Sequence, residues 1–364
     1  MGPNEEQAIV TTTGNKPPDQ GGPPRPVTMQ DIARAAGVSQ STVSRVLNDT
    51  PTSVPIAAKT RERVQEVAQR LGYRPNPLAR GLRGARTMLL GVIVRDITDP
   101  FFAMAVEALS TEALARGYNV VLGSAHSKAD EAIALRAVLE TRHCDAIVLL
   151  GDMRDEPKFL EDLRASQTPM VALWHGTVLE GVQTVNTDNR VGMVAGLDHL
   201  LGLGHSRVAF IGGRPLGDIR ERHTAFLDYF EGKGAPVPEE YVHYPIDGPA
   251  GGDAALRTLI GLEVPPTAVV CTTDHLATGV LHAAADLGVA IPGNLSVVGF
   301  DDIPLASYTV PSLTTIHMPV NEMTAIAAGL AMDEAEPGSA DRAQSFVVAP
   351  SLVIRKSTGE AVRG

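Results

Sequence analysis

The chain has 364 residues, enough for two or three compact units, and its 44% hydrophobic content excludes disorder along the whole length. Its formal net charge of −11 argues at first against a nucleic-acid ligand, but the charge is unevenly distributed. Residues 27–90 carry ten Lys or Arg against four acidic residues, whereas the chain beyond residue 90 carries −16. This asymmetry predicts one small module that attracts phosphate groups and a larger part that does not.

Several classes of protein are not expected. No apolar run reaches the roughly 18 residues of a membrane-spanning helix, and the N-terminus lacks the pattern of a secretory signal, so we expect a cytoplasmic protein without a membrane partner. Cys144 and Cys271 belong to no Cys-x-x-Cys pair, and the histidines show no metal-ligand spacing. We therefore expect reduced core cysteines, no metal and no cofactor.

The first 26 residues are rich in Gly, Pro, Gln and Thr and show almost no apolar periodicity. A segment of this composition cannot build a core, so we predict a disordered tail. The first folded unit is expected to begin just after it.

A helix-turn-helix is predicted from Thr28 onward. Thr28 and Asp31 form a capping box, in which each side chain accepts a hydrogen bond from the other residue's backbone N–H. Gly37 permits the tight turn, and Ser39 caps the second helix, which we expect over residues 40–48. The side chains expected to face inward are Ile32, Ala35 and Ala36 in the first helix and Val43, Val46 and Leu47 in the second.

The outward face of the second helix has the chemistry of DNA recognition. Gln40 and Ser41 can donate and accept at base edges in the major groove, and Arg45 can make a bidentate contact to guanine. Each residue alone would equally suit a solvated polar face, but together with the local charge of +6 they favour DNA. The hydrogen-bonding residues expected to contact the DNA backbone are Thr28, Ser39, Thr42, Ser44, Asn48 and Asn76.

A third helix is predicted from Thr60 to Leu71, closing at Gly72. Its expected core face consists of Val64, Val67, Ala68 and Leu71.

A short basic helix is predicted next, with Asn76 as its cap and Gly84 as its end. A helix of this length is not stable alone in water, so it needs a partner to form. Leu82 suits a wedge that enters the minor groove while Arg80 and Arg83 hold phosphates. The alternative is a flexible linker whose leucines pack on the preceding unit.

From Met88 onward, apolar runs of strand length alternate with helical segments. Continuous apolar strands have both faces buried, which indicates an α/β fold with parallel sheets. Roughly 270 residues exceed what one core covers, so two similar lobes are expected, with a ligand between them at the carboxyl ends of the strands. The predicted strands span residues 89–94, 119–122, 146–150, 170–173, 208–211, 268–270 and 296–300, and the predicted helices 103–116, 129–141, 191–203 and 276–287.

Long stretches of the chain resemble the lactose/galactose repressor (LacI/GalR) family. The headpiece and hinge of that family are matched by VTMQDIARAAGVSQSTVSRVL at 27–47, TRERV at 60–64 and LGYRPNPLARGLR at 71–83. The similarity continues through GVIVRDITDPFF, the NTDN at 186–189, GHSRVAFIGG, TAVVCTTDHLATG and SVVGFDDIPLASYTVPSLTTI. It covers essentially everything after the tail.

The resemblance implies a homodimeric transcriptional regulator, most simply a repressor, that binds a palindromic operator and a small carbohydrate effector. It implies a helix-turn-helix domain over 27–75, a hinge helix and linker over 76–87, and a two-lobed, periplasmic-binding-protein-like effector and dimerisation domain over 88–364. A dimer also reads two half-sites with two headpieces, so its selectivity is the square of that of one headpiece. Gln40, Ser41 and Arg45 would then read bases, and Leu82 would intercalate at the operator centre.

For effector binding, the resemblance points to aromatic side chains that stack on a ring and polar ones that bind hydroxyls, which both donate and accept. For Asp188 and Asp274 a helix cap or a structural ion pair is the alternative. The implied effector residues are Phe101, Phe102, Asp188, Arg222, Thr273, Asp274 and Asp301. Trp174 is added to them from its position near a strand end, where it could be a second stacking platform.

The chain departs from the family pattern at three places. Five residues separate Val54 from Thr60, where the family usually has three. Trp174 stands where many relatives have a small or acidic residue, and Thr273 replaces a common Asn. The last two leave room for a ligand other than the common hexoses.

Two other functions compete with regulation. An enzyme is not favoured, because the sequence has no G-x-S-x-G elbow, no P-loop and no G-x-G-x-x-G after the first strand, and we predict no catalytic residues. The sugar-binding protein of a transporter would suit the same core, but the basic headpiece argues against it.

Overall fold

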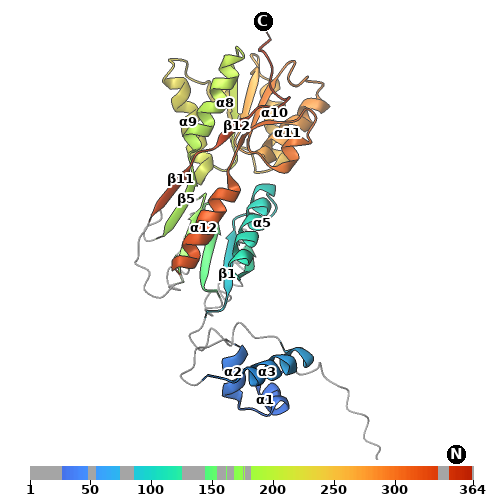
Figure 1. Cartoon of the computed structure of the whole chain (residues 1–364). Helices are drawn as coiled ribbons and strands as arrows, with labels where there is room; N and C mark the ends of the chain where they lie inside the picture. Colours follow the sequence, from blue (N-terminus) through green and yellow to red (C-terminus); the bar gives the residue numbers. More distant parts are fainter. Residues whose placement is uncertain are drawn as a thin grey trace, which may run out of the picture. The chain divides into compact units, whose positions relative to one another are not determined.

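The computed structural model describes residues 27–47, 55–73, 86–124, 144–153, 161, 168–174, 176, 182–334 and 344–362. The chain divides into two units, residues 1–76 and 77–364, each considered by itself (Figure 1). Several predicted features lie outside the described residues: the tail at 1–26, the helix at 129–141, the hinge helix, and the side chains of Asn48, Asn76, Arg80, Leu82 and Arg83.

The first unit is a bundle of three helices around a small apolar core. α1 begins with the predicted capping box: the Thr28 backbone N–H donates to Asp31 Oδ2 over 3.0 Å, and the Asp31 N–H donates to Thr28 Oγ1 over 3.4 Å. Gly37 ends α1 with φ +62°, a value that glycine adopts without strain. The helices are α1 (Met29–Ala36), α2 (Gln40–Leu47) and α3 (Ala58–Arg70).

Two predictions about this core are wrong. Ala35 is exposed and Ala33 is buried in its place, because the inward stripe of α1 runs through Ile32, Ala33 and Ala36. Leu71 lies just past the end of α3 and is 36% exposed. The other predicted core residues of α2 and α3 are buried or pack against the cluster.

The second unit has two lobes, each built on a six-stranded sheet. All neighbouring strands of the first sheet are parallel, in the order β11-β5-β4-β3-β1-β2. Helix α12 packs beside α5 on this sheet (Figure 1). The elements of the first lobe are β1 (Leu89–Val94), α5 (Pro100–Ala115), β2 (Asn119–Ser124), β3 (Ala146–Leu150), β4 (Met170–Leu173), β5 (Gln183–Thr187), α12 (Val320–Glu334) and β11 (Ser345–Val348).

The second sheet has the order β12-β10-β9-β8-β6-β7, and its described strands are parallel except for the β10–β12 pair. Its elements are α8 (Asn189–Gly202), β6 (Val208–Ile211), α9 (Gly217–Glu231), η1 (Glu239–Tyr241), β7 (Val242–His243), α10 (Pro249–Ile260), β8 (Ala268–Cys271), α11 (Asp274–Asp286), β9 (Ser296–Asp301), η2 (Pro304–Ser307), β10 (Thr314–His317) and β12 (Ser351–Val353).

The two lobes repeat one topology, as the sequence predicts. In both sheets the first strand of the lobe, β1 or β6, lies between the second and third strands, so a topological switch point falls beside it. The described chain passes between the lobes after β5, after β10 and after β11. These three short connections are the places where one lobe can move relative to the other.

All seven predicted strands are present, but five other described strands were not predicted: β5, β7, β10, β11 and β12. The side chains of β5 and β10 are largely polar and nevertheless buried, including Thr184, Asn186 and Thr315. The helices α5, α8 and α11 also begin two or three residues earlier than predicted, because Asp99, Asp188 and Thr273 cap them. The helices α8 and α11 therefore begin within three residues of the end of the preceding strand, whereas five residues separate β1 from α5.

Both cysteines are free, and burial raises the pKa of the Cys144 thiol to about 11. The described part of the chain contains no group of three His, Cys, Asp or Glu side chains that could hold a metal ion. None of its helices is long and apolar enough to cross a membrane.

Candidate functional site

A cavity of about 60 Å³ lies between the lobes, at the switch points of both sheets. The first lobe contributes the ends of β1, β3 and β4 and the start of α5, and the second contributes the start of α9 and the ends of β8 and β9. Its lining residues are Arg95, Asp99, Phe101, Phe102, Gly151, Asp152, Trp174, Leu216, Asp218, Ile219, Arg222, Thr273 and Asp301.

The first lobe supplies an aromatic wall. The Phe101 and Trp174 rings meet edge to face with centroids 4.7 Å apart, and Phe101 meets Phe102 in the same way at 5.5 Å. The Trp174 indole N–H donates to the Met323 sulfur over 3.3 Å, which fixes the plane of the ring. All three predicted aromatic residues are therefore brought together, each less than a tenth exposed.

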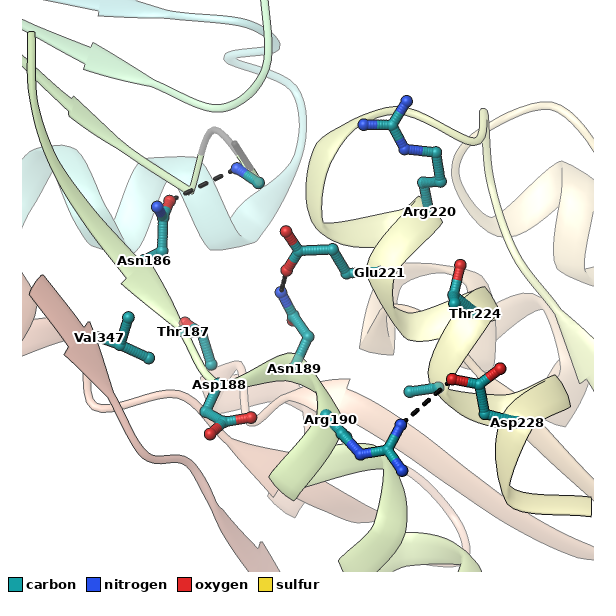
Figure 2. A pocket seen from close by; sticks show the side chains of 12 residues that line it. Asn186, Thr187, Asp188, Asn189, Arg190, Arg220, Glu221, Thr224, Asp228 and Val347 are labelled. Carbon is teal, nitrogen blue, oxygen red and sulfur yellow. Dashed lines mark hydrogen bonds and ion pairs between the residues drawn. The ribbon is translucent and has the colours of Figure 1, made fainter. Parts of the chain in front are cut away.

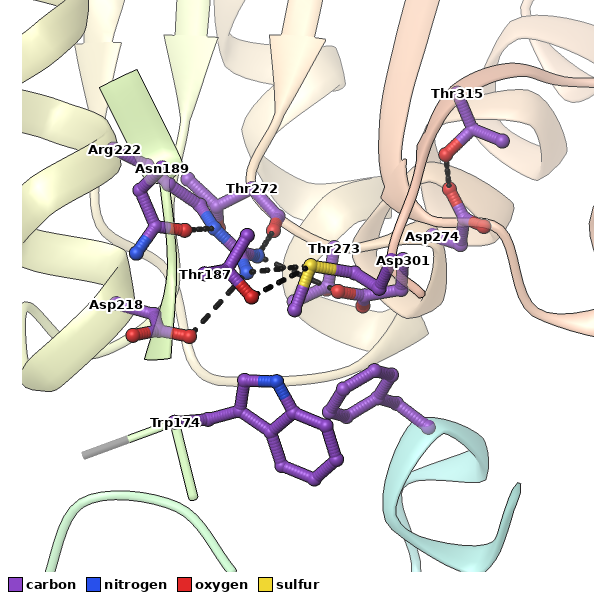
Figure 3. Close-up of polar contacts among 12 residues, drawn as sticks. Trp174, Thr187, Asn189, Asp218, Arg222, Thr272, Thr273, Asp274, Asp301 and Thr315 are labelled. Carbon is purple, nitrogen blue, oxygen red and sulfur yellow. Dashed lines mark hydrogen bonds and ion pairs between the residues drawn. The ribbon is translucent and has the colours of Figure 1, made fainter. Parts of the chain in front are cut away.

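In the second lobe the guanidinium of Arg222 is buried and donates its hydrogen bonds to other residues of the protein (Figure 3). Arg222 Nε donates to Asn189 Oδ1 over 2.8 Å, and Nη1 donates to the Thr272 carbonyl oxygen and to Asp301 Oδ1, the latter over 3.4 Å. Its Cζ lies 3.6 Å from the centre of the Phe300 ring. Arg222 is thus held by three segments of its own lobe: the start of α8, the end of β8 and β9.

Asp301 is buried and pairs with Arg222 of the same lobe over 3.4 Å. Burial raises the pKa of Asp301 well above its usual range, although Arg222 opposes the shift. Its backbone has φ +111°, a left-handed value that is strained for a residue with a side chain. Asp301 therefore combines a strained backbone with a desolvated carboxyl group that faces the cavity.

Thr273 lines the cavity and also caps α11, since its hydroxyl accepts from the Leu276 N–H over 3.1 Å. Asp274, next to it, does not line the cavity. Both of its oxygens are occupied, by the Thr315 hydroxyl at 2.6 Å and the Ile303 N–H at 2.9 Å. Burial raises the pKa of Asp274 to about 7.

Asp188 lies at a different cavity, about 520 Å³ in volume, between α8, α9, β5 and β11 (Figure 2). Its carboxylate accepts from the Val191 N–H over 2.9 Å and so caps α8. In the same cavity Arg190 pairs with Asp228, and Asn189 donates to Glu221 over 2.8 Å. The structure therefore brings together six of the eight predicted effector residues and places Asp188 and Asp274 elsewhere.

Four charged residues line the inter-lobe cavity without being among the predicted effector residues: Arg95, Asp99, Asp152 and Asp218. Arg95 directly follows β1, Asp152 lies two residues after β3, and Asp99 and Asp218 lie at the starts of α5 and α9. The sequence places the segments 96–102 and 212–222, which contain Asp99 and Asp218, beyond the carboxyl ends of strands. The same rule could have identified Arg95 and Asp152.

The predicted DNA-reading face lies on the first unit. Gln40, Ser41 and Arg45 are exposed on α2, away from the core. The Ser39 hydroxyl accepts from the Thr42 N–H over 3.1 Å and lies 2.8 Å from the hydroxyls of Ser41 and Thr42. Ser39 therefore caps α2 as predicted and gathers three hydroxyl groups at its N-terminus.

Two protein families match the chain. The family described as "Bacterial regulatory proteins, lacI family" matches residues 28–76, and the "Periplasmic binding protein-like domain" matches residues 197–358.

Named relatives match the chain over most of its length. The HTH-type transcriptional regulator GalS of Salmonella typhimurium is 34% identical over 334 residues, which is 91% of this chain and 96% of the relative. Catabolite control protein A of Priestia megaterium is 31% identical and covers 83% of this chain and 90% of its own. The HTH-type transcriptional repressor PurR of Yersinia pestis is 32% identical, with 92% and 97% covered. The first and third are named as transcriptional regulators, and none of the three as an enzyme.

Solved structures show the same fold. The Lac repressor dimer bound to operator and the anti-inducer ONPF matches with a TM-score of 0.80 at 24% identity, over 92% of this chain and all of the other. The complex of the transcriptional regulator CelR with cellobiose matches with a TM-score of 0.68 at 27% identity, again over 92% and 100%.

Proposed function

The chain belongs to the lacI family of bacterial regulatory proteins, and on this premise we propose that it is a repressor controlled by a sugar or sugar derivative bound between its lobes. DNA binding and control of transcription follow from the family itself. The protein would act as a homodimer on a palindromic operator, in the cytoplasm where the chromosome lies.

On the DNA side, the proposal assigns base reading to Gln40, Ser41 and Arg45. These three side chains are exposed on one helix whose opposite face, with Val43 and Val46, is buried in the headpiece core. A rigid helix that presents two polar groups and a guanidinium suits the major groove. Thr28, Ser39, Thr42 and Ser44 are proposed to contact phosphates, together with Asn48 and Asn76.

The observation that carries the effector proposal is the buried Arg222–Asp301 pair opposite the Phe101–Trp174 wall. A sugar has an apolar ring face that can pack on an aromatic side chain and hydroxyls that bind charged groups. CelR, whose fold this chain shares, was solved with cellobiose.

Ligand entry requires the lobes to move. The inter-lobe cavity of about 60 Å³ is far smaller than the roughly 300 Å³ or more of a ligand pocket. A bound effector therefore widens the cleft at the three connections between the lobes. We propose that this movement changes the spacing of the two hinge segments in a dimer and so decides whether both can engage DNA.

The proposal is tested on the full-length protein with a DNA site selected from random sequence. Fluorescence anisotropy then measures its affinity for that site with and without each of a set of mono- and disaccharides. We expect the selected site to be an inverted repeat and at least one sugar to change the affinity for it tenfold or more. A non-palindromic site, or an affinity that no member of the set changes, would contradict the proposal.

A further inference from the structure

Two buried polar atoms at the inter-lobe cavity have no hydrogen-bond partner among the described residues: Asp218 Oδ1 and Arg95 Nε. Asp218 is only 9% exposed, and in Figure 3 its carboxylate points from α9 toward Arg222 and Trp174. Almost all buried polar atoms in proteins are paired. One unpaired acceptor and one unpaired donor therefore require a partner that both donates and accepts hydrogen bonds, as a water molecule or a ligand hydroxyl does.

The position of Asp218 is set by the approach of the two lobes. Gly176, which follows β4 in the first lobe, lies so close to the start of α9 that a Cβ there would be 2.8 Å from the Asp218 backbone nitrogen. Its other carboxylate oxygen, Oδ2, lies 3.7 Å from Arg222 Nη2. Asp218 is thus held at the meeting point of both lobes, beside Arg222 and Asn189, and its Oδ1 accepts no hydrogen bond from the described residues.

The charges around the cavity exclude one class of ligand. Four carboxyl groups line it, on Asp99, Asp152, Asp218 and Asp301, against two guanidinium groups. Arg222 is balanced by Asp218 and Asp301, and Arg95 lies 3.6 Å from Asp247 Oδ2. Each guanidinium of the lining is therefore paired with at least one carboxylate, and the cavity has more carboxyl than guanidinium groups.

Burial raises the pKa of three of these carboxyls, Asp99, Asp218 and Asp301. A protonated carboxyl is a neutral hydrogen-bonding group, and an ionised one repels anions. In either state the carboxyls favour a hydroxyl-bearing ligand over a phosphate or a carboxylate.

We propose that the cavity takes an uncharged polyhydroxylated ligand that donates to Asp218 Oδ1 and accepts from Arg95 Nε, and that Asp218 excludes phosphorylated and acidic sugars. A hydroxyl can satisfy either atom, whereas an ammonium group would satisfy only Asp218 and an anion only Arg95. This inference rests on the proposed effector role of the cavity and specifies its ligand class.

The experiment compares probes that differ in charge on one scaffold: glucose, galactose, cellobiose, glucosamine, glucose 6-phosphate and galacturonate. Thermal unfolding midpoints and titration calorimetry are measured on full-length wild type, Asp218→Asn and Asp228→Asn. Asp228 lies on the same helix but faces the other cavity, so it is the matched control. Circular dichroism without ligand checks folding, and Asp218→Ser replaces the Asn variant if that one unfolds.

We expect a neutral sugar to stabilise the wild type and both anionic probes to have no effect. Asp218→Asn should weaken binding of that sugar roughly tenfold or more, because a charged hydrogen bond is lost, while Asp228→Asn should change it less than twofold. Stronger binding of glucose 6-phosphate or galacturonate than of the parent sugar would overturn the inference. Unchanged affinity in Asp218→Asn would overturn it as well.

DNA affinity, measured in parallel, separates this inference from the proposed function. A neutral sugar that needs Asp218 but leaves DNA affinity unchanged supports the ligand class and contradicts sugar control of DNA binding. An anionic sugar that binds and changes DNA affinity contradicts the ligand class and supports sugar control of DNA binding.

Discussion

Gly176 of the first lobe lies directly against the backbone of Gly217 in the second lobe, with no space between them for a Cβ atom. Both glycines have positive φ, +69° and +46°. The contact adjoins the Arg222 network and the start of α9, which carries Asp218. Two glycines therefore set how closely the lobes approach beside the cavity.

Replacing Gly176 by Ala should force the lobes apart. We expect a loss of roughly 1–3 kcal/mol in the free energy of unfolding, because the new methyl group meets backbone that cannot rotate away. Urea denaturation measures the change. Gly234→Ala is the control, since Gly234 has φ +67° and a Cβ there meets nothing within 4 Å, so it has similar backbone strain without the contact. Equal stability of the Gly176 and Gly234 variants would show that the contact does not constrain the lobes.

Replacing Arg45 by Ala should relax sequence preference at one base pair in each half-site. The expected cost is about 1–3 kcal/mol on cognate DNA, the contribution of a bidentate contact to guanine. Arg34→Ala removes the same charge from α1, where the side chain is 76% exposed, and should weaken binding equally on all sequences. Anisotropy with cognate and scrambled DNA compares them. The same loss on both DNAs for the Arg45 variant would rule out base reading.

Leu82 lies outside the described residues, and its role as a wedge remains a prediction from the sequence. Leu82→Ala should weaken binding to the selected site more than to non-specific DNA, because unstacking a base step requires an apolar side chain. Gel shifts on both DNAs measure the ratio of affinities. A ratio equal to that of the wild type would favour the flexible-linker alternative.

Asp301→Asn should abolish the ligand response and leave DNA binding intact, because the side chain faces the cavity and pairs with Arg222. Asp302→Asn is the matched control. Asp302 follows Asp301 in sequence but bonds Arg355 at 2.6 Å and His317 at 3.0 Å instead of facing the cavity. Its variant should lose some stability and keep the response. Retained response in the Asp301 variant would remove that residue from the site.

The buried carboxyl of Asp274 should make stability depend on pH. Its pKa is about 7 in the folded state and near 3.8 when unfolded, so between these values the folded chain holds the extra proton. Stability should therefore fall as pH rises through this window, by at most about 1.4 kcal/mol per pH unit from this group.

The Asp274→Asn variant has no carboxyl group at this position to ionise. Its free energy of unfolding should therefore increase relative to that of the wild type between pH 5 and pH 8. Urea denaturation at the two pH values gives the difference. A wild-type minus variant difference that is constant with pH would show that Asp274 ionises normally.

Local patterns identified much of the fold correctly. The capping box of Thr28 and Asp31, the turn at Gly37 and the apolar strand at 89–94 all depend on residues a few positions apart, so the sequence displays them directly. Five described strands were not predicted: β7, β11 and β12 are only partly buried, and β5 and β10 are buried but largely polar. Thr315, for example, is buried only because its hydroxyl donates to Asp274, far away in the chain.

Family motifs pointed to Phe101, Phe102, Arg222 and Asp301, and Trp174 stood out as a departure from them. The sequence alone determined that this chain combines a basic headpiece with a two-lobed core. The sequence alone could not show which of three similarly placed aspartates faces the ligand cavity. Asp188, Asp218 and Asp274 all stand at the start of a helix that follows a strand. Only the tertiary structure directs Asp218 into the cavity and the other two to a helix cap and a neighbouring strand. The reason is physical: which carboxylate faces a ligand depends on how two lobes meet, and that meeting is set at Gly176 and Gly217, which are distant in sequence.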